Sequence, residues 1–476
     1  MLAAVLPACA PPSTPIVLVS LDTLRADRLG CYGGTGKLTP NLDAFAAEGV
    51  LFEHAYSQTT TTAPSHASLF TSRYPSEQDA GTRKPEIAAG MKTLAEVLTA
   101  YGWDTAAFVA GGDLAPELGV GRGFGTWESS VDFGSLWHTG PRALEWLDTR
   151  RTAGDWLLFV NGYDAHVPYL KPSPYGYLHA DARAQGPAAR AARLSTDIVL
   201  DGWIHPDLAV LAEAGEEEVR PRSPRARAAL LAQAQASGGP ALHQVSEADI
   251  ALIRGTYDGA VQYADAQFGL LMAGLQDHGV LDTAIVVVLS DHGEQLGEDG
   301  VFNHCCGVRE EESHVPLIVR MPAGRSGGRR VSGLVELVDV MPTLLDLAGA
   351  VIPAGVHGQS LAPALRGETF AGRDIAWTQG GINMRMVSGR TRTGRLVYSG
   401  GSVASLLTPE LIGSAALPGP SFPFAEGLDA EQQDDVRQAM ASWLGHLAPP
   451  PAAREAPLPD ALRASLRAHG YFGVEP

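Results

Sequence analysis

Three places in the chain put metal-binding or acid–base groups just past an apolar run. They are Asp22 after residues 15–21, Asp291 and His292 after residues 284–290, and Asp164 with His166 beyond residues 156–161. Such runs predict buried strands of a parallel sheet, and ligands bind at the carboxyl ends of these strands. A strand-terminal aspartate also commonly caps the next turn. We nevertheless expect the three places to meet at one edge of a sheet, where the carboxylates of Asp22 and Asp291 and the imidazole of His292 would bind a divalent cation.

A run of hydroxyl side chains, residues 59–62, leads into Ala63-Pro64-Ser65-His66. Proline at a first helical position predicts a strand, a sharp turn and a helix that begins at Pro64. A turn of this kind places a side chain at the positive end of a helix, where anions bind. Taken alone, the run is more typical of a helix cap on the surface. Together with the predicted cation site, it favours Thr62 as a catalytic nucleophile.

The chemistry that these groups suit is attack on an ester of a strong oxyacid. A divalent cation bound by Asp22, Asp291, His292 and the Thr62 hydroxyl would activate that hydroxyl and polarise the ester. Sulfate and phosphate esters need both effects, because their oxygens repel an incoming anion. His166 and His304 would neutralise the outer oxygens or protonate the leaving group.

Composition excludes several classes of protein. The chain has 476 residues, enough for two domains or for one large domain with an appendage. Hydrophobic residues make up 45% and charged residues 18%, as in folded globular proteins. A net charge of −18 argues against nucleic-acid binding, which needs basic patches, and we expect no nucleic-acid partner. A small anionic substrate stays compatible with it, because a local cation outweighs the global field.

Alternation of strand and helix patterns predicts the fold class, an α/β doubly wound and mostly parallel sheet flanked by helices. Strands are expected at 15–22, 50–56, 105–110, 156–161, 284–290 and 315–320, and helices at 39–46, 93–98, 143–147, 247–276 and 338–349. The helix at 247–276 has an apolar stripe and is expected only to pack in the core. Residues 16–368 would form the catalytic domain, with an insertion or lid at 172–246.

The last part of the chain, residues 369–476, predicts a smaller α+β subdomain. Its expected elements are antiparallel strands at 375–378, 384–388 and 395–398 and helices at 428–447 and 462–471.

The first 15 residues predict a leader or a lipoprotein-like tail. Residues 6–9, Leu-Pro-Ala-Cys, resemble a bacterial lipobox, in which Cys9 would carry a lipid anchor. The basic start of a signal peptide is missing, so an ordinary tail is the alternative. No run approaches the roughly 18 apolar residues of a membrane-spanning helix. Because residues 6–9 resemble a lipobox, we expect a periplasmic or cell-envelope protein that carries a lipid anchor at Cys9.

The other cysteines, Cys31, Cys305 and Cys306, lack the paired spacing of a zinc site. A disulfide between the adjacent Cys305 and Cys306 would be strained. A bridge from Cys31 to either one stays open.

Two specific segments, Ser290-Asp291-His292-Gly293-Glu294 and residues 311–317, together with most of the first 365 residues, resemble the sulfatase branch of the alkaline phosphatase superfamily. The resemblance implies one divalent metal ion bound by Asp22, Asp291 and His292, and a nucleophile that bridges metal and substrate. Calcium is the metal that it favours, with magnesium, manganese and zinc as alternatives. It also implies that His166 and His304 bind substrate or serve the leaving group.

The chain departs from the family pattern at the nucleophile. Active sulfatases carry Cys-x-Pro-Ser-Arg, or a serine version, and convert the first residue to formylglycine. Residues 62–66 read Thr-Ala-Pro-Ser-His, and threonine is not a substrate for that conversion. Ser65 and His66 are expected to bind substrate, with His66 in the place of the arginine. Thr23 stands where the family has a second aspartate, and no basic residue appears at 111–113.

Three functions follow from these residues. The first is metal-dependent hydrolysis or transfer of sulfate or phosphate esters by Thr62, acting on a small-molecule, glycan or lipid ester. The second is a degenerate sulfatase fold that binds an anionic glycan or lipid headgroup without turnover. The third, an inert structural protein, agrees least with carboxylates at several buried strand ends.

Overall fold

The computed structural model describes residues 14–78, 87–88, 90–116, 119–129, 133–150, 154–169, 171–179, 247–298, 301–304, 307–380, 386–399 and 424–447. Its centre is a nine-stranded sheet in the order β11-β2-β10-β6-β1-β5-β3-β4, with β9 paired to β2. The strands are β1 Ile16–Leu21, β2 Val50–Tyr56, β3 Asp104–Phe108, β4 Thr126–Glu128, β5 Trp156–Gly162, β6 Ile285–Leu289, β9 His314–Val315, β10 Leu317–Arg320 and β11 Arg329–Glu336.

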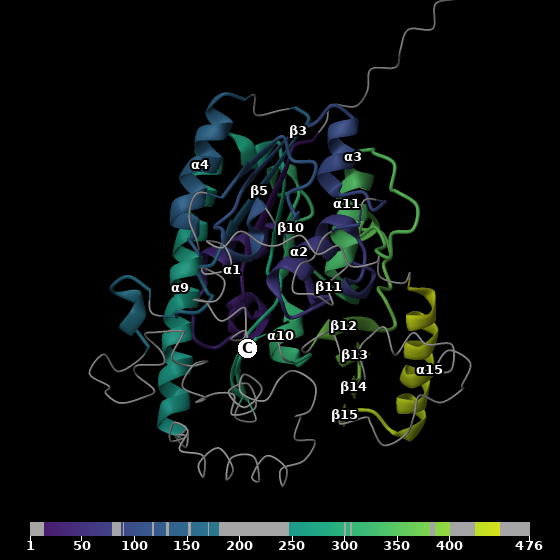
Figure 1. Cartoon of the computed structure of the whole chain (residues 1–476). Helices are drawn as coiled ribbons and strands as arrows, with labels where there is room; N and C mark the ends of the chain where they lie inside the picture. Colours follow the sequence, from purple (N-terminus) through teal and green to yellow (C-terminus); the bar gives the residue numbers. More distant parts are fainter. Residues whose placement is uncertain are drawn as a thin grey trace, which may run out of the picture.

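Helices cover both faces of this sheet (Figure 1). The first face carries α1 Pro40–Glu48, α4 Leu136–Asp148 and α9 Glu247–Asp277, and the second carries α2 Thr62–Thr71, α3 Leu94–Ala100, α11 Val340–Leu347 and α12 Ala362–Arg366. The predicted doubly wound, mostly parallel fold is confirmed.

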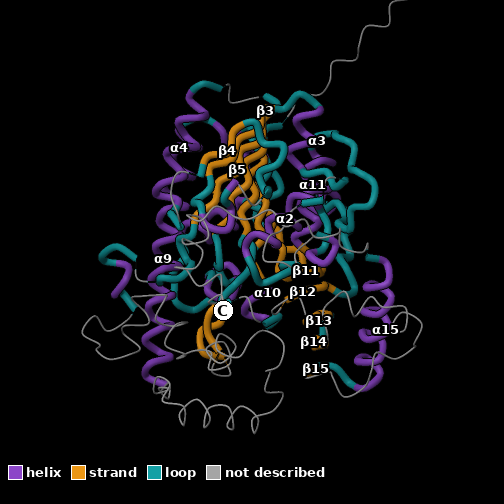
Figure 2. The backbone as a smooth tube through the Cα atoms, viewed as in Figure 1, coloured by secondary structure: helices purple, strands orange, loops and turns teal. Residues whose placement is uncertain are grey.

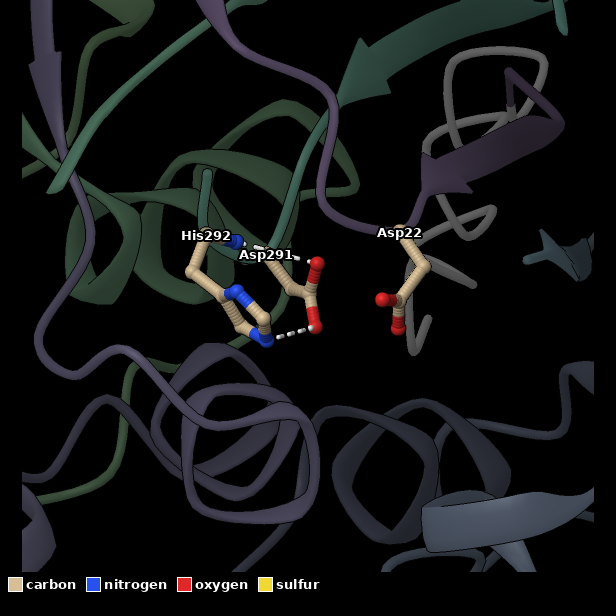
Figure 3. Close-up of side chains that lie close together, drawn as sticks. All are labelled: Asp22, Asp291 and His292. Carbon is tan, nitrogen blue, oxygen red and sulfur yellow. Dashed lines mark hydrogen bonds and ion pairs between the residues drawn. The ribbon is translucent and has the colours of Figure 1, made fainter. Parts of the chain in front are cut away.

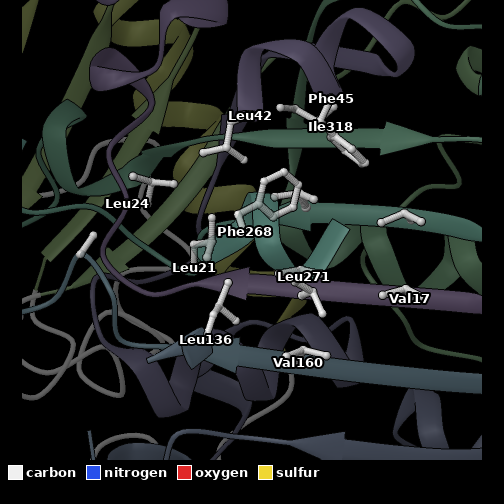
Figure 4. Packing of buried hydrophobic residues seen from close by; sticks show 14 of the residues in the cluster. Val17, Leu21, Leu24, Leu42, Phe45, Leu136, Val160, Phe268, Leu271 and Ile318 are labelled. Atoms are coloured by element: carbon white, nitrogen blue, oxygen red, sulfur yellow. The ribbon is translucent and has the colours of Figure 1, made fainter. Parts of the chain in front are cut away.

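Alternation along the central strands explains the two cores. In β1, Val17, Val19 and Leu21 pack under the first set of helices, and Ile16 and Leu18 pack under the second. Figure 4 shows the first core, where Val17 and Leu21 meet side chains of α1, α4 and α9. Side chains point alternately to the two faces of a strand, so every second residue of β1 faces α2. Ser20 and the residue two places on, Asp22, therefore face the helix that begins at Thr62.

The structure differs from the expected elements in several details, among them the short strand β4, which was not expected. Helix α2 begins at Thr62, so Pro64 is its third residue and not its first. The predicted strand at 315–320 divides at Pro316 into β9 and β10, and β10 runs antiparallel to both neighbours. Strand β11, parallel to β2, has no counterpart among the expected strands.

The C-terminal part forms a separate antiparallel sheet, in the order β12-β13-β14-β15 (Figure 2). Its elements are β12 Ala376–Gly380, β13 Met386–Arg390, β14 Arg395–Ser399, β15 Phe424–Glu426 and the covering helix α15 Ala430–His446. The predicted small α+β region is thus confirmed. The predicted tail with Cys9, residues 180–246 of the predicted insertion, the Cys305–Cys306 pair and the helix at 462–471 lie outside the described residues.

Within the described part of the chain, no helix is both long enough and apolar enough to cross a membrane. Cys31 forms no disulfide with a residue in this described part.

Candidate active site

One row of side chains crosses the three central strands just past their carboxyl ends. Ile16 of β1 pairs with Ile285 of β6, a register that places Asp22 beside Asp291. On the other side, Leu21 pairs with Gly162 of β5, and the Asp22 amide donates to the Gly162 carbonyl at 3.0 Å. The pairing of β1 with β5 therefore continues one residue beyond the strands and places Asp22 beside Tyr163. All members of this row face α2.

The ligand atoms of Asp22, Asp291 and His292 all lie within 4.8 Å of one another, and all three residues are buried (Figure 3). Neither carboxylate oxygen of Asp22 has a hydrogen-bond partner among the described residues, and Oδ2 of Asp291 has only long contacts, 3.4 Å to His292 Nε2 (dashed in Figure 3) and 3.6 Å to His66 Nδ1. Burial, and then the Asp291 charge, raise the pKa of Asp22 well above its usual range. Unpartnered buried carboxylates are costly, and a divalent cation satisfies all of them at once. The donor set therefore fits the predicted cation.

His292 is held in the tautomer that a metal ligand needs. Its Nδ1 lies 3.0 Å from the Gly293 carbonyl, which can only accept, so Nδ1 donates and Nε2 keeps its lone pair. Burial lowers the pKa of His292 to about 4, so the ring is neutral at pH 7. Glycine at 293 is required here, because a Cβ atom would collide with the Glu311 carbonyl oxygen. The Asp-His-Gly sequence thus positions Nε2 beside the carboxylates.

Thr62 brings its hydroxyl to the same point from the other side. It is the first residue of α2 and is fully buried. Its Oγ1 lies 3.2 Å from His292 Nε2, and the hydroxyl is close enough to Asp22 to lower the pKa of that carboxyl in part. The helix N-terminus adds positive potential at this point, which favours a developing oxyanion. Thr60 differs, because its hydroxyl donates to the Gly307 carbonyl.

Ser65 and His66, predicted to bind substrate, both make hydrogen bonds within the protein. The Ser65 hydroxyl donates to the Asp291 carbonyl at 2.8 Å. His66 Nδ1 donates to the Thr62 carbonyl at 2.9 Å, which leaves Nε2 to accept from the Ser20 hydroxyl at 3.0 Å. These bonds tie α2 to the ends of β1 and β6. They fix Thr62, while substrate binding by Ser65 and His66 stays a prediction.

His166 and His304 lie together beside the cation ligands. Their ring centroids are 5.0 Å apart, and the ring centroid of His304 lies 4.6 Å from that of His292. His166 Nδ1 donates to the Val167 carbonyl, and burial, followed by His304, lowers its pKa well below the usual range. Although burial opposes charge on His304, the Glu294 carboxylate at 3.1 Å from Nδ1 raises the pKa of that ring. The two rings therefore differ in their affinity for a proton, which His304 holds more tightly than His166 does.

Asp164 does not join the cation ligands. Its Oδ2 accepts from the Leu136 amide at 2.9 Å and so caps α4. Beside it, the Lys171 ammonium donates to the carbonyls of Tyr163 and His166. Burial lowers the pKa of Lys171 to about 8, although Asp164 works against that shift. Lys171 therefore fastens the loop that carries His166.

Sequence reasoning missed Lys171, Glu294 and Tyr257. The Tyr257 hydroxyl on α9 donates to the Thr23 carbonyl at 2.7 Å and accepts from the Arg25 amide at 3.1 Å. The helix expected only to fill the core therefore also fixes the loop after Asp22. Glu294 in the Ser290–Glu294 motif was the one available signal, since its carboxylate follows two predicted ligands.

Known proteins are similar to this chain in sequence and in fold. The chain is 26% identical to the N-acetylglucosamine-6-O-sulfatase of Bacteroides thetaiotaomicron over 406 residues, covering 74% of this chain and 71% of the relative. It is also 26% identical to the multifunctional alkaline phosphatase superfamily protein PehA of Trinickia caryophylli over 424 residues, covering 74% and 76% of the two chains.

Solved structures agree in fold. The phosphonate monoester hydrolase of Agrobacterium radiobacter superposes with a TM-score of 0.65 at 20% identity, covering 95% of this chain and 96% of the other. The enzyme of the same name from Silicibacter pomeroyi gives 0.60 at 20% identity, covering 91% and 95%. The family model "Sulfatase" matches residues 14–350, which include every predicted site residue. The protein therefore belongs to the sulfatase family of the alkaline phosphatase superfamily, and it is a sulfatase-like hydrolase.

Proposed function

We propose that the protein hydrolyses or transfers sulfate or phosphate esters, with Thr62 as nucleophile and a divalent cation in the site. The observation that carries this proposal is the position of the Thr62 hydroxyl. It lies at a helix N-terminus, 3.2 Å from the lone-pair nitrogen of His292, beside two carboxylates with unpartnered buried oxygens.

Asp22, Asp291, His292 and Thr62 are the proposed ligands. The cation that they hold would lower the pKa of the Thr62 hydroxyl and withdraw charge from the ester oxygens. Three oxygen donors and one nitrogen suit calcium, magnesium or manganese, and tolerate zinc. We propose calcium as the resident ion, in line with the family.

The reaction has two steps. In the first, Thr62 Oγ1 bonds to the sulfur or phosphorus atom while the bond to the leaving oxygen breaks. The threonine proton passes to the neutral His166, and His304 delivers a proton to the leaving oxygen. In the second, water or an acceptor alcohol attacks the threonine ester. The bond to Thr62 Oγ1 breaks, and sulfate, phosphate or the transferred ester leaves. His304 takes the proton of the attacking water or alcohol, and His166 returns its proton to Thr62 Oγ1.

A second candidate function is binding of an anionic glycan or lipid headgroup without turnover. It is supported by His66, which replaces the family's arginine. Both ring nitrogens of His66 are engaged in hydrogen bonds, to the Thr62 carbonyl and the Ser20 hydroxyl. Thr23 also supports it, because its hydroxyl donates to the Asp22 carbonyl and adds no carboxylate to the site. A site with fewer charged groups is weaker at stabilising transition-state charge.

A metal-restoration assay separates the two functions. The full chain is stripped with chelator, reloaded with calcium, magnesium, manganese or zinc, and supplied with aryl sulfate, phosphate monoester, phosphodiester and phosphonate ester. N-acetylglucosamine 6-sulfate is included because one relative is named an N-acetylglucosamine-6-O-sulfatase. The proposal predicts turnover of at least one ester that depends on metal and disappears in Thr62→Ala. Binding of phosphate with no turnover by any metal form would instead establish the second function.

A further inference from the structure

One more side chain stands in the row that holds the two proposed carboxylate ligands. Because Leu21 pairs with Gly162 and the Asp22 amide donates to the Gly162 carbonyl, the residue beside Asp22 is Tyr163. Leu157 and Phe159 of β5 pack in the core on the α2 side, so Tyr163 also faces that side by alternation. The row therefore reads Asp291, Asp22, Tyr163 across β6, β1 and β5.

The ring of Tyr163 is fixed by its neighbours. Its amide donates to the Gly134 carbonyl at 2.9 Å. Its ring centroid lies 5.0 Å from that of Phe133 and 5.2 Å, edge to face, from that of His166. The side chain is only 2% exposed. A ring packed in this way holds its hydroxyl at one point.

The proton of that hydroxyl has no acceptor among the described residues. Burial, followed by the charges of Asp22, Asp113 and Asp291, raises the pKa of the Tyr163 hydroxyl well above its usual range, while the Asp113 amide lowers that pKa in part. A buried hydroxyl whose proton has no acceptor destabilises the fold, whereas phenylalanine would fill the same space without that cost. This free-energy cost is explained if the Tyr163 hydroxyl gains an acceptor when ligand is bound.

We propose that the Tyr163 hydroxyl is a catalytic group that donates a hydrogen bond to an outer oxygen of the ester bound at Asp22 and Asp291. This assignment rests on the proposed function, since the acceptor is the oxyanion on which Thr62 acts. Phosphate and sulfate oxygens accept strong charge-assisted hydrogen bonds. The phenol would add a neutral hydrogen-bond donor to a site in which His66 stands in place of the family's arginine.

Tyr163→Phe tests the assignment, because it removes the oxygen and keeps the ring. Calorimetry with inorganic phosphate on the calcium-loaded full chain should show affinity weaker by about tenfold to a hundredfold, the effect of one hydrogen bond to a charged group. The kcat/KM for the best ester should fall by a similar factor. The free energy of unfolding without metal should stay equal or rise, since a hydroxyl whose proton has no acceptor has been removed.

Tyr398→Phe is the matched control, a buried tyrosine of β14 in the C-terminal sheet, and it should leave phosphate affinity and kcat/KM unchanged. Unchanged phosphate affinity and rate in Tyr163→Phe would overturn the assignment. A wild-type chain that binds phosphate but hydrolyses nothing would remove the proposed hydrolysis, and the phosphate affinities would still decide the role of Tyr163.

Discussion

The Thr62 hydroxyl donates to Nε2 of His292 across 3.2 Å, because the other ring nitrogen of His292 already donates to the Gly293 carbonyl. Both atoms are proposed ligands of the same cation. Cation binding would therefore replace this hydrogen bond by two coordination bonds, and it would direct the lone pairs of Thr62 toward the substrate.

Removal of the Asp22 carboxylate should raise the stability of the metal-free protein and lower that of the metal-loaded protein. Asp22→Asn should raise the melting temperature of the chelator-treated protein, because burial disfavours the Asp22 carboxylate. The wild type should gain about 2.7 kcal/mol at a metal concentration of 100 Kd, and the variant should gain almost nothing. Thermal melts with and without calcium check this. The exposed Asp282, at the opposite end of β6, gives the control Asp282→Asn, and equal metal effects in both variants would contradict the site.

The raised pKa of His304, next to the Glu294 carboxylate, predicts a dependence on the leaving group. His304→Gln should slow hydrolysis of alkyl esters by about 10²–10⁴-fold, the usual contribution of a general acid. Nitrophenyl esters should be much less affected, because their leaving oxygen needs no proton. Steady-state rates over a series of leaving groups measure the difference, with His278→Gln at the end of α9 as control. A uniform loss over the series would show that His304 has another role.

Ser20 and His66 should be energetically coupled. Ser20→Ala leaves the buried Nε2 of His66 without its donor, at a cost of about 1–3 kcal/mol. In a His66→Phe background the same substitution should cost clearly less. Denaturant unfolding of the two single variants and the double variant gives the coupling energy. Equal costs in both backgrounds would mean that this hydrogen bond does not hold α2 against β1.

Glu312 predicts a pH dependence of stability. Burial raises the pKa of Glu312 from its usual 4.5 to about 7, so the folded protein keeps this proton to higher pH than the unfolded chain does. The resulting stability is complete below pH 4.5 and is lost as pH rises through about 7. Glu312→Gln should therefore be more stable than wild type by about 3 kcal/mol at pH 8 and equal to it at pH 4.

Denaturant unfolding between pH 4 and pH 8 measures the Glu312 effect. The exposed Glu368→Gln should follow the wild type at every pH. A constant difference between Glu312→Gln and wild type would contradict a raised pKa.

The sheet and the cation ligands could be predicted because they follow local patterns. The apolar runs that end at Asp22 and Asp291 indicate buried parallel strands, and such strands deliver their last residues to one edge. Strand β11 was missed because its exposed first half, Arg329 and Arg330, lacks an apolar run. The start of α2 was misplaced because proline is tolerated throughout the first helical turn, so Pro64 did not fix the boundary.

The supporting contacts could not be predicted, since they depend on register and on pairs of segments far apart in the chain. Tyr163 lies beside Asp22 only because β1 and β5 pair in one particular register. Nothing in the sequence distinguishes Lys171 from the other basic residues. Its role follows only from the hydrogen bonds that its ammonium donates to two carbonyls of the same loop. Asp164 also follows a predicted strand, but alternation turns it to the opposite face, where it caps α4.

Peptide mapping of a quenched reaction tests the central claim most directly. Metal-loaded protein is mixed with its best ester, quenched in acid within the first turnovers, digested and analysed by mass spectrometry. Thr62 should carry a phosphoryl or sulfuryl group in wild type and in Thr61→Ala. Thr62→Ala should carry none and should lose turnover. Full turnover in Thr62→Ala, or the group on any other residue, would contradict Thr62 as the nucleophile.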